Sequence, residues 1–240
     1  MVLDSKNFFF LSILPIMKLK WLGHSCFIIE GNNRIIVDPF ITGNPMCNLK
    51  PEEIIVDIVA ITHGHSDHLG DGIEIAKRND ATVVAIHEIA QYAISKGAKA
   101  EGINMGGGVK IGGTKIIMTP AWHSSGLDET NFAISTTPAG LIIDSGEVIY
   151  HAGDTCLFSD MKLIGELYNP KVALLPIGGR YTMDVWQASM AAEWIKAEIA
   201  IPMHYNTFEL IRQDAKEFKK LVEEKGIKAI ILSPGEEVEI

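Results

Sequence analysis

Residues 61–70, with the sequence ITHGHSDHLG, contain the feature that most constrains this chain. Three histidines and one aspartate fall within six positions there, namely His63, His65, Asp67 and His68. The preceding run IIVDIVAIT, residues 54–62, is apolar and rich in β-branched residues, which is typical of a buried central strand. A polar surface loop seldom gathers four metal-ligating side chains at such spacing. The segment therefore indicates a metal site at the end of a buried strand.

Three further polar residues follow strand-like runs later in the chain. His123 follows a strand predicted at residues 115–119, Asp154 follows EVIYHAG, and His204 follows IAIPM. Side chains at strand ends can converge on one edge while the sheet holds them rigid. Taken singly, His123 could be an ordinary loop histidine, Asp154 a turn or N-cap residue, and His204 a satisfied core histidine.

The kinds of metal-ligating side chain in this set favour a pair of divalent ions. Five imidazoles and two carboxylates suit Zn²⁺ above all, with Mn²⁺, Fe and Ni²⁺ as alternatives. His63 and His65 are two apart, so in extended backbone they point the same way. A turn at residues 66–68 could swing Asp67 and His68 toward a neighbouring position. One short loop could thus serve two ions.

The segment THGHSDH resembles the T-H-x-H-x-D-H signature of the metallo-β-lactamase-fold superfamily, and His123, Asp154 and His204 occur in that family's order. The resemblance extends over residues 18–240. Within the superfamily, WLGHSCF, DPFITGNP, YHAGDT and IPMHYNTF are similar to compact metal-dependent hydrolases related to the L-ascorbate-6-phosphate lactonases.

The resemblance implies a four-layer αββα sandwich and a dinuclear metal-dependent hydrolase. A metal-bridging hydroxide would attack an ester, lactone, amide or phosphoester. Asp67 and Asp154 are the predicted catalytic residues. The implied ligands are His63, His65 and His123 for one metal, Asp67, His68 and His204 for the other, and Asp154 between them.

Three more residues are weaker candidates for the site. Asp38 matches a family position beneath the metals and could orient a ligand histidine, although it could equally form an Asp-Pro turn. His24 lies in a Gly-His-Ser turn that is near the site in the lactonase-like group. Arg180 is the candidate for binding an anionic substrate group, with a solvated arginine as the alternative.

The order of elements also predicts an α/β (α+β) sandwich, because strands come first in each half and helices later. Residues 18–21, 26–30 and 34–37 are expected to form an antiparallel meander, and residues 106–121 a hairpin. NFAIST, residues 131–136, is expected to be a strand. Residues 207–226 are expected to form one long helix.

The remaining expectations come from composition. Residues 17–240 are predicted to be a single domain, and residues 1–16 an N-terminal extension rather than a signal peptide. The apolar run at residues 8–17 is too short to span a membrane. Three cysteines, an odd number without a C-x-x-C pair, favour a reducing, cytoplasmic setting.

The charge balance bears on the partner. There are 21 basic and 30 acidic residues, a net charge of −9, which argues against nucleic acid and favours a small-molecule substrate. Two alternatives stay open: a phosphodiesterase or nuclease of the tRNA-processing type, and a non-catalytic metal-binding module. The oligomeric state is not predicted.

Overall fold

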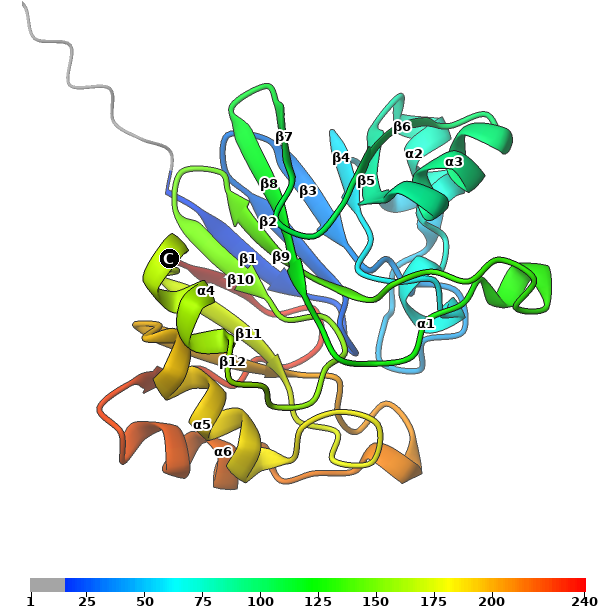
Figure 1. The fold of residues 1–240 in the computed structure, drawn as a ribbon. Coiled ribbons are helices and arrows are strands. Elements are labelled where there is room, and N and C mark those ends of the chain that lie inside the picture. Colours follow the sequence, from blue (N-terminus) through cyan, green and yellow to red (C-terminus); the bar gives the residue numbers. More distant parts are fainter. Residues whose placement is uncertain (1–15) are drawn as a thin grey trace, which may run out of the picture.

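The computed structural model describes residues 16–240 and consists of two seven-stranded sheets (Figure 1). The first sheet has the strand order β14-β1-β2-β3-β4-β5-β6. Its strands are β1 Lys18–Trp21, β2 Phe27–Glu30, β3 Arg34–Val37, β4 Ile58–Ala60, β5 Thr82–Ile86, β6 Lys99–Ile103 and β14 Glu237–Glu239.

The second sheet has the order β13-β12-β11-β10-β9-β8-β7. Its strands are β7 Gly108–Ile111, β8 Thr114–Pro120, β9 Ala139–Asp144, β10 Val148–His151, β11 Val172–Pro176, β12 Ile199–Met203 and β13 Lys228–Ala229. Each sheet mixes antiparallel strands with a parallel run, β3 to β6 in the first sheet and β10 to β13 in the second.

The helices lie on the outer faces of the two sheets. In Figure 1, α2 and α3 lie beside β5 and β6, whereas α5 and α6 lie at the opposite side next to β11 and β12. The helices are α1 Ser66–Leu69, α2 Gly72–Asn79, α3 His87–Ser95, α4 Met161–Tyr168, α5 Val185–Ile195 and α6 Ala215–Glu223. One buried apolar cluster unites residues of both sheets and of the covering helices. This layering confirms the predicted αββα sandwich.

Several local predictions are confirmed. β1, β2 and β3 pair antiparallel, with Leu19 opposite Ile29 and Ile28 opposite Ile36. β7 and β8 form the predicted hairpin. The run before the histidine cluster supplies β4, which pairs parallel with β3 and β5 and is fully buried. The turn expected at residues 66–68 is one turn of helix, α1.

Two predictions are wrong. Residues 131–136 contain no strand, since Asn131 and Phe132 have φ values of +50° and +60°, which an extended strand cannot accommodate. The predicted helix over 207–226 is interrupted: a 3₁₀ turn occupies Glu209–Ile211, and α6 begins only after Asp214. The Asp214 carboxylate accepts a hydrogen bond from the backbone N–H of Lys216 and so starts a new helix.

The predicted extension, residues 1–16, lies outside the described residues apart from Ile16. Within residues 16–240 there is no helix of the length and apolarity needed to cross a membrane.

Candidate metal centre

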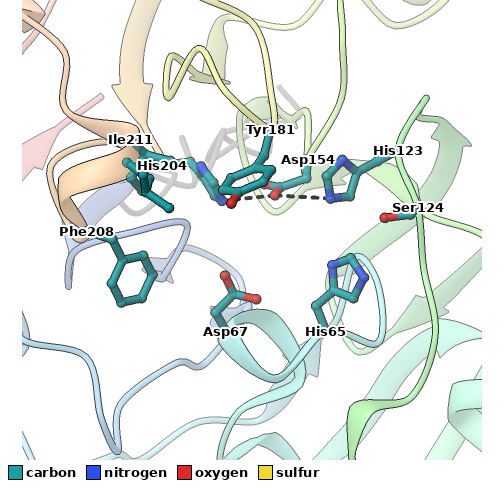
Figure 2. Close-up of a pocket in the computed structure, with 10 residues that line it drawn as sticks. His65, Asp67, His123, Ser124, Asp154, Tyr181, His204, Phe208 and Ile211 are labelled. Carbon is teal, nitrogen blue, oxygen red and sulfur yellow. Dashed lines mark ion pairs between the residues drawn. The ribbon is translucent and has the colours of Figure 1, made fainter. Parts of the chain in front are cut away.

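The loops after four strands bring the predicted ligands to one edge of the sandwich. His63 and His65 follow β4, His123 follows β8, Asp154 follows β10, and His204 follows β12. Asp67 and His68 lie on α1. Figure 2 shows His65, Asp67, His123, Asp154 and His204 pointing into one space. That space is a cavity of about 450 Å³.

Six of the seven side chains fall into two adjoining groups. In one, ligand atoms of His63, His65 and His123 all lie within 4.8 Å of one another. In the other, those of Asp67, His68 and His204 do so together with His24. This division is the one that the family resemblance implied.

Asp154 lies between the two groups. Its Oδ2 is 2.9 Å from His204 Nε2, 3.4 Å from His68 Nε2 and 3.7 Å from His123 Nε2. Asp154 also shares a third potential metal-holding group with His63 and His68. One carboxylate therefore contacts histidines of both groups.

The donor set fits divalent metal ions. His68 Nε2 and Asp154 Oδ1 are buried and have no hydrogen-bond partner within the described part of the chain. Buried polar atoms normally have a hydrogen-bond partner. Two such atoms without a partner, in one cluster of imidazoles and carboxylates, match a set of metal ligands. Among the described residues, no lysine or arginine lines the cavity to balance the two carboxylates.

Burial and mutual charge shift the pKa values of the cluster. Burial, reinforced by the neighbouring His68, holds the pKa of His63 well below its usual value. Burial opposes protonation of His68 too, but Asp154, Asp38 and Asp67 outweigh it and raise the His68 pKa. The pKa of Asp154 is lowered: burial opposes this, and His204 and His68 overcome it. The carboxylate is thus held ionised, the form in which it ligates metals.

Asp38 forms hydrogen bonds with residues of the cluster and of the strand end beside it. It is fully buried in a left-handed backbone conformation, φ +46°. Its Oδ1 accepts the Thr62 N–H at 2.8 Å, and its Oδ2 accepts the Thr62 hydroxyl at 2.7 Å. The same Oδ2 lies 2.7 Å from His68 Nδ1. Asp38 therefore fixes the ring of His68 and the backbone just before His63, which is the orienting position predicted for it.

His24 lies in the predicted Gly-His-Ser turn, and its ring lies beside Asp67. Its φ is +55°, its ring is buried, and its Nε2 is 3.1 Å from Asp67 Oδ2. Its Nδ1 lies 2.9 Å from the Thr207 hydroxyl. Burial, with the nearby His204, lowers the pKa of His24 to about 4. The ring is therefore neutral at neutral pH and can donate one hydrogen bond to Asp67.

Arg180 lies outside the cavity. Its side chain is exposed, and its guanidinium carbon is 5.6 Å from the ring centre of Tyr181. Tyr181 lines the cavity in its place, together with Ser124, Phe208, Leu210 and Ile211. Sequence reasoning missed these wall residues, because Phe208, Leu210 and Ile211 fell in a segment predicted as helix.

Fold and donor set together define a metal-dependent hydrolase of the metallo-β-lactamase fold. Residues 18–204 match the family model described as a beta-lactamase superfamily domain. Over 93% of its length the chain is 51% identical to a UPF0173 metal-dependent hydrolase of Methanosarcina barkeri, covering 99% of that protein. The corresponding protein of Archaeoglobus fulgidus is 47% identical over 93% of the chain and 99% of its own length. The chain belongs to the UPF0173 metal-dependent hydrolases.

A solved structure agrees with this assignment. Igni18, a metallo hydrolase from Ignicoccus hospitalis, is 45% identical with a TM-score of 0.86. The match covers 93% of this chain and 98% of Igni18. The enzyme class predicted from the sequence is confirmed.

Proposed function

We propose that the cluster holds two divalent metal ions, most simply Zn²⁺, and that the enzyme hydrolyses an ester, lactone, amide or phosphoester of a small metabolite. The observation that carries the proposal is Asp154, whose one carboxylate contacts histidines of both groups. The proposed ligands are His63, His65 and His123 for one ion, Asp67, His68 and His204 for the other, and Asp154 for both.

The chain's own residues would prepare this site in three ways. Asp38 holds His68 through Nδ1 and leaves Nε2 facing the cluster. His24 holds one oxygen of Asp67 and leaves the other free. The Asp154 carboxylate is kept ionised by the histidines around it. When bound, divalent ions supply Lewis acidity and a water acidic enough to act as a nucleophile near neutral pH.

The cavity supports a small-molecule substrate. Its volume of about 450 Å³ lies within the usual range for small-molecule sites. The net charge of −9 weighs against a nucleic acid substrate. The free cysteines Cys26, Cys47 and Cys156 support the proposal of a reducing, cytoplasmic setting. An anionic substrate group bound by Arg180 gains no support from the position of that side chain.

Metal analysis combined with a substrate panel tests the proposal. We expect two equivalents of divalent metal per chain, and hydrolysis of at least one member of a panel of esters, lactones, amides and phosphodiesters. Asp154→Ala should lose both the metal and the activity. One equivalent of metal would contradict the dinuclear assignment. Activity confined to RNA would favour the nuclease alternative. Two metals without any turnover would favour the non-catalytic binding module.

A further inference from the structure

The wall of the cavity is divided by polarity. Figure 2 shows Phe208 and Ile211 on the side of Asp67 and His204, and Ser124 on the side of His123. Leu210 and Tyr181 also line the cavity. One end of the cavity is therefore apolar and aromatic, and the other end is polar.

The apolar wall, comprising Tyr181, Phe208, Leu210 and Ile211, is uncovered in the chain alone. Phe208 is 43% exposed, Tyr181 52% and Leu210 57%, whereas Ile211 is buried. Exposed apolar side chains that gather beside a catalytic cluster mark a binding surface, because covering them releases water at a favourable free energy.

The apolar wall is also preformed. The ring centre of Phe208 lies 5.7 Å from that of His24 and 6.4 Å from that of Phe40. The 3₁₀ turn carrying Leu210 is closed by the Ile211 N–H bonding to the Phe208 carbonyl at 3.1 Å. A second hydrogen bond, from the Asn206 N–H to the Ile211 carbonyl at 3.0 Å, joins the two ends of the segment 206–211. The wall thus stands in place before any ligand arrives.

We propose that the apolar wall binds an alkyl or aryl group of the substrate, and that Phe208 and Leu210 determine specificity. The inference rests on the proposed hydrolase function, because the group must extend from a bond held at the Asp154 cluster. The occupant is a small molecule, since the wall is continuous with that cluster inside one cavity of about 450 Å³. Within the part of the chain that the structure describes, no lysine or arginine lines this cavity, so a second anionic group on the substrate would find no cationic side chain there.

A homologous series of ligands tests the apolar wall separately from catalysis. Acetate, butyrate, hexanoate and octanoate would be titrated into the purified holoenzyme by calorimetry. We expect the dissociation constant to fall by up to about fourfold for each added methylene that the wall buries. A flat series, including no measurable binding of octanoate, overturns the proposal.

Three variants test whether the dependence of affinity on fatty-acid length arises at the apolar wall. Phe208→Ala and Leu210→Ser should flatten the dependence on chain length. Leu210→Ser guards against damage to the cluster, because Leu210 is largely exposed and Phe208 contacts His24. Leu167→Ser is the matched control, since Leu167 is 71% exposed on α4 and does not line the cavity. If affinity depends on the length of the fatty acid in both wall variants as it does in the native enzyme, the apolar wall is not the binding surface and the proposal is refuted.

Two further outcomes separate the possible failures. If the ligand series behaves as expected while no member of the substrate panel is hydrolysed, the apolar wall stands and the proposed function fails. If acetyl and hexanoyl esters are hydrolysed with equal kcat/KM in the native and wall variants, the function stands and the wall proposal fails. If Leu210→Ser converts a dimer to a monomer without changing the ligand series, the wall is a contact between copies of the chain and the proposal is wrong.

Discussion

Replacing Asp38 with asparagine keeps the size of a fully buried side chain and removes its charge. In the native chain Oδ1 accepts the Thr62 N–H, while Oδ2 accepts the Thr62 hydroxyl and faces His68 Nδ1. A carboxylate can only accept, so Nδ1 of His68 carries a proton. In the neutral ring Nε2 then keeps its lone pair, and it faces Asp154 Oδ2 at 3.4 Å.

Asparagine would reverse this arrangement. Its amide oxygen must stay opposite the Thr62 N–H, because an NH₂ group there would face another donor. The NH₂ group then faces His68 Nδ1, which must accept and pass its proton to Nε2. A protonated Nε2 cannot ligate a metal. We expect metal affinity at the Asp67–His68–His204 group to fall by about 10- to 100-fold, and the free energy of unfolding to fall by about 1.5–3 kcal/mol for the lost charge-assisted bond.

The assay is a competitive zinc titration against a chelator, with nitrogen NMR of the histidine rings reporting the tautomer of His68. Asp71→Asn is the matched control. The Asp71 carboxylate also accepts three hydrogen bonds, from the Ile41 N–H, the Thr42 N–H and the Thr42 hydroxyl, but none from a histidine. Native zinc affinity in Asp38→Asn, or an equal loss in Asp71→Asn, would refute the reasoning.

Three other outcomes are expected. Asp67→Ala and Asp154→Ala should lose metal and activity but keep the native circular dichroism, because the core is large enough without the ions; unfolding of either variant would instead mean a structural metal. Chelated protein should lose stability as the pH falls below about 6.5, because the folded state keeps His24 neutral down to about 4 while the unfolded state takes up the proton. His24 alone should lower the free energy of unfolding by about 1.4 kcal/mol for each pH unit between these values. A urea midpoint that does not change between pH 7 and 5 would contradict this prediction. Arg180→Lys should leave KM unchanged, since Arg180 does not line the cavity; an increase would restore it as a substrate residue.

The ligand cluster could be predicted because its signals are local. β4 is a short β-branched run that forms a buried strand, and the donors follow it directly. His123, Asp154 and His204 each follow a strand in the same way. These strands belong to two packed sheets, and their ends meet at one edge of the sandwich, which brings such residues together without any detailed knowledge of the loops. Singly the later signals are ambiguous, and the family resemblance joined them into one ligand set. The predicted fold is confirmed, and the seven predicted donors lie in adjoining groups.

The cavity wall could not be predicted, because tertiary contacts override local propensity there. Residues 207–226 have the composition of one amphipathic helix. The Asn206 side chain, however, accepts the Gln213 N–H at 2.9 Å, and Asp214 starts α6 afresh. This interruption turns Phe208 and Leu210 toward the cavity. A pattern at helical spacing places the same two residues on a helix surface.

Arg180 shows why loop residues are the hardest to assign. Gly179 has a φ of +77°, and the Arg180 N–H donates to the Gly178 carbonyl at 2.9 Å, so the chain reverses within three residues. After such a turn no periodicity tells which neighbour faces inward, and here Tyr181 does. Having Tyr181 instead of Arg180 at the cavity changes the expected chemistry. An arginine would select a carboxylate or phosphate, whereas a tyrosine ring in the same cavity as Phe208 favours an apolar group. The net charge is −9, and no lysine or arginine among residues 16–240 lines the cavity, so the side chains supply no permanent positive charge that would attract an anion. Binding energy for the substrate must then come mainly from the apolar wall and from the metals that the histidines and aspartates would hold.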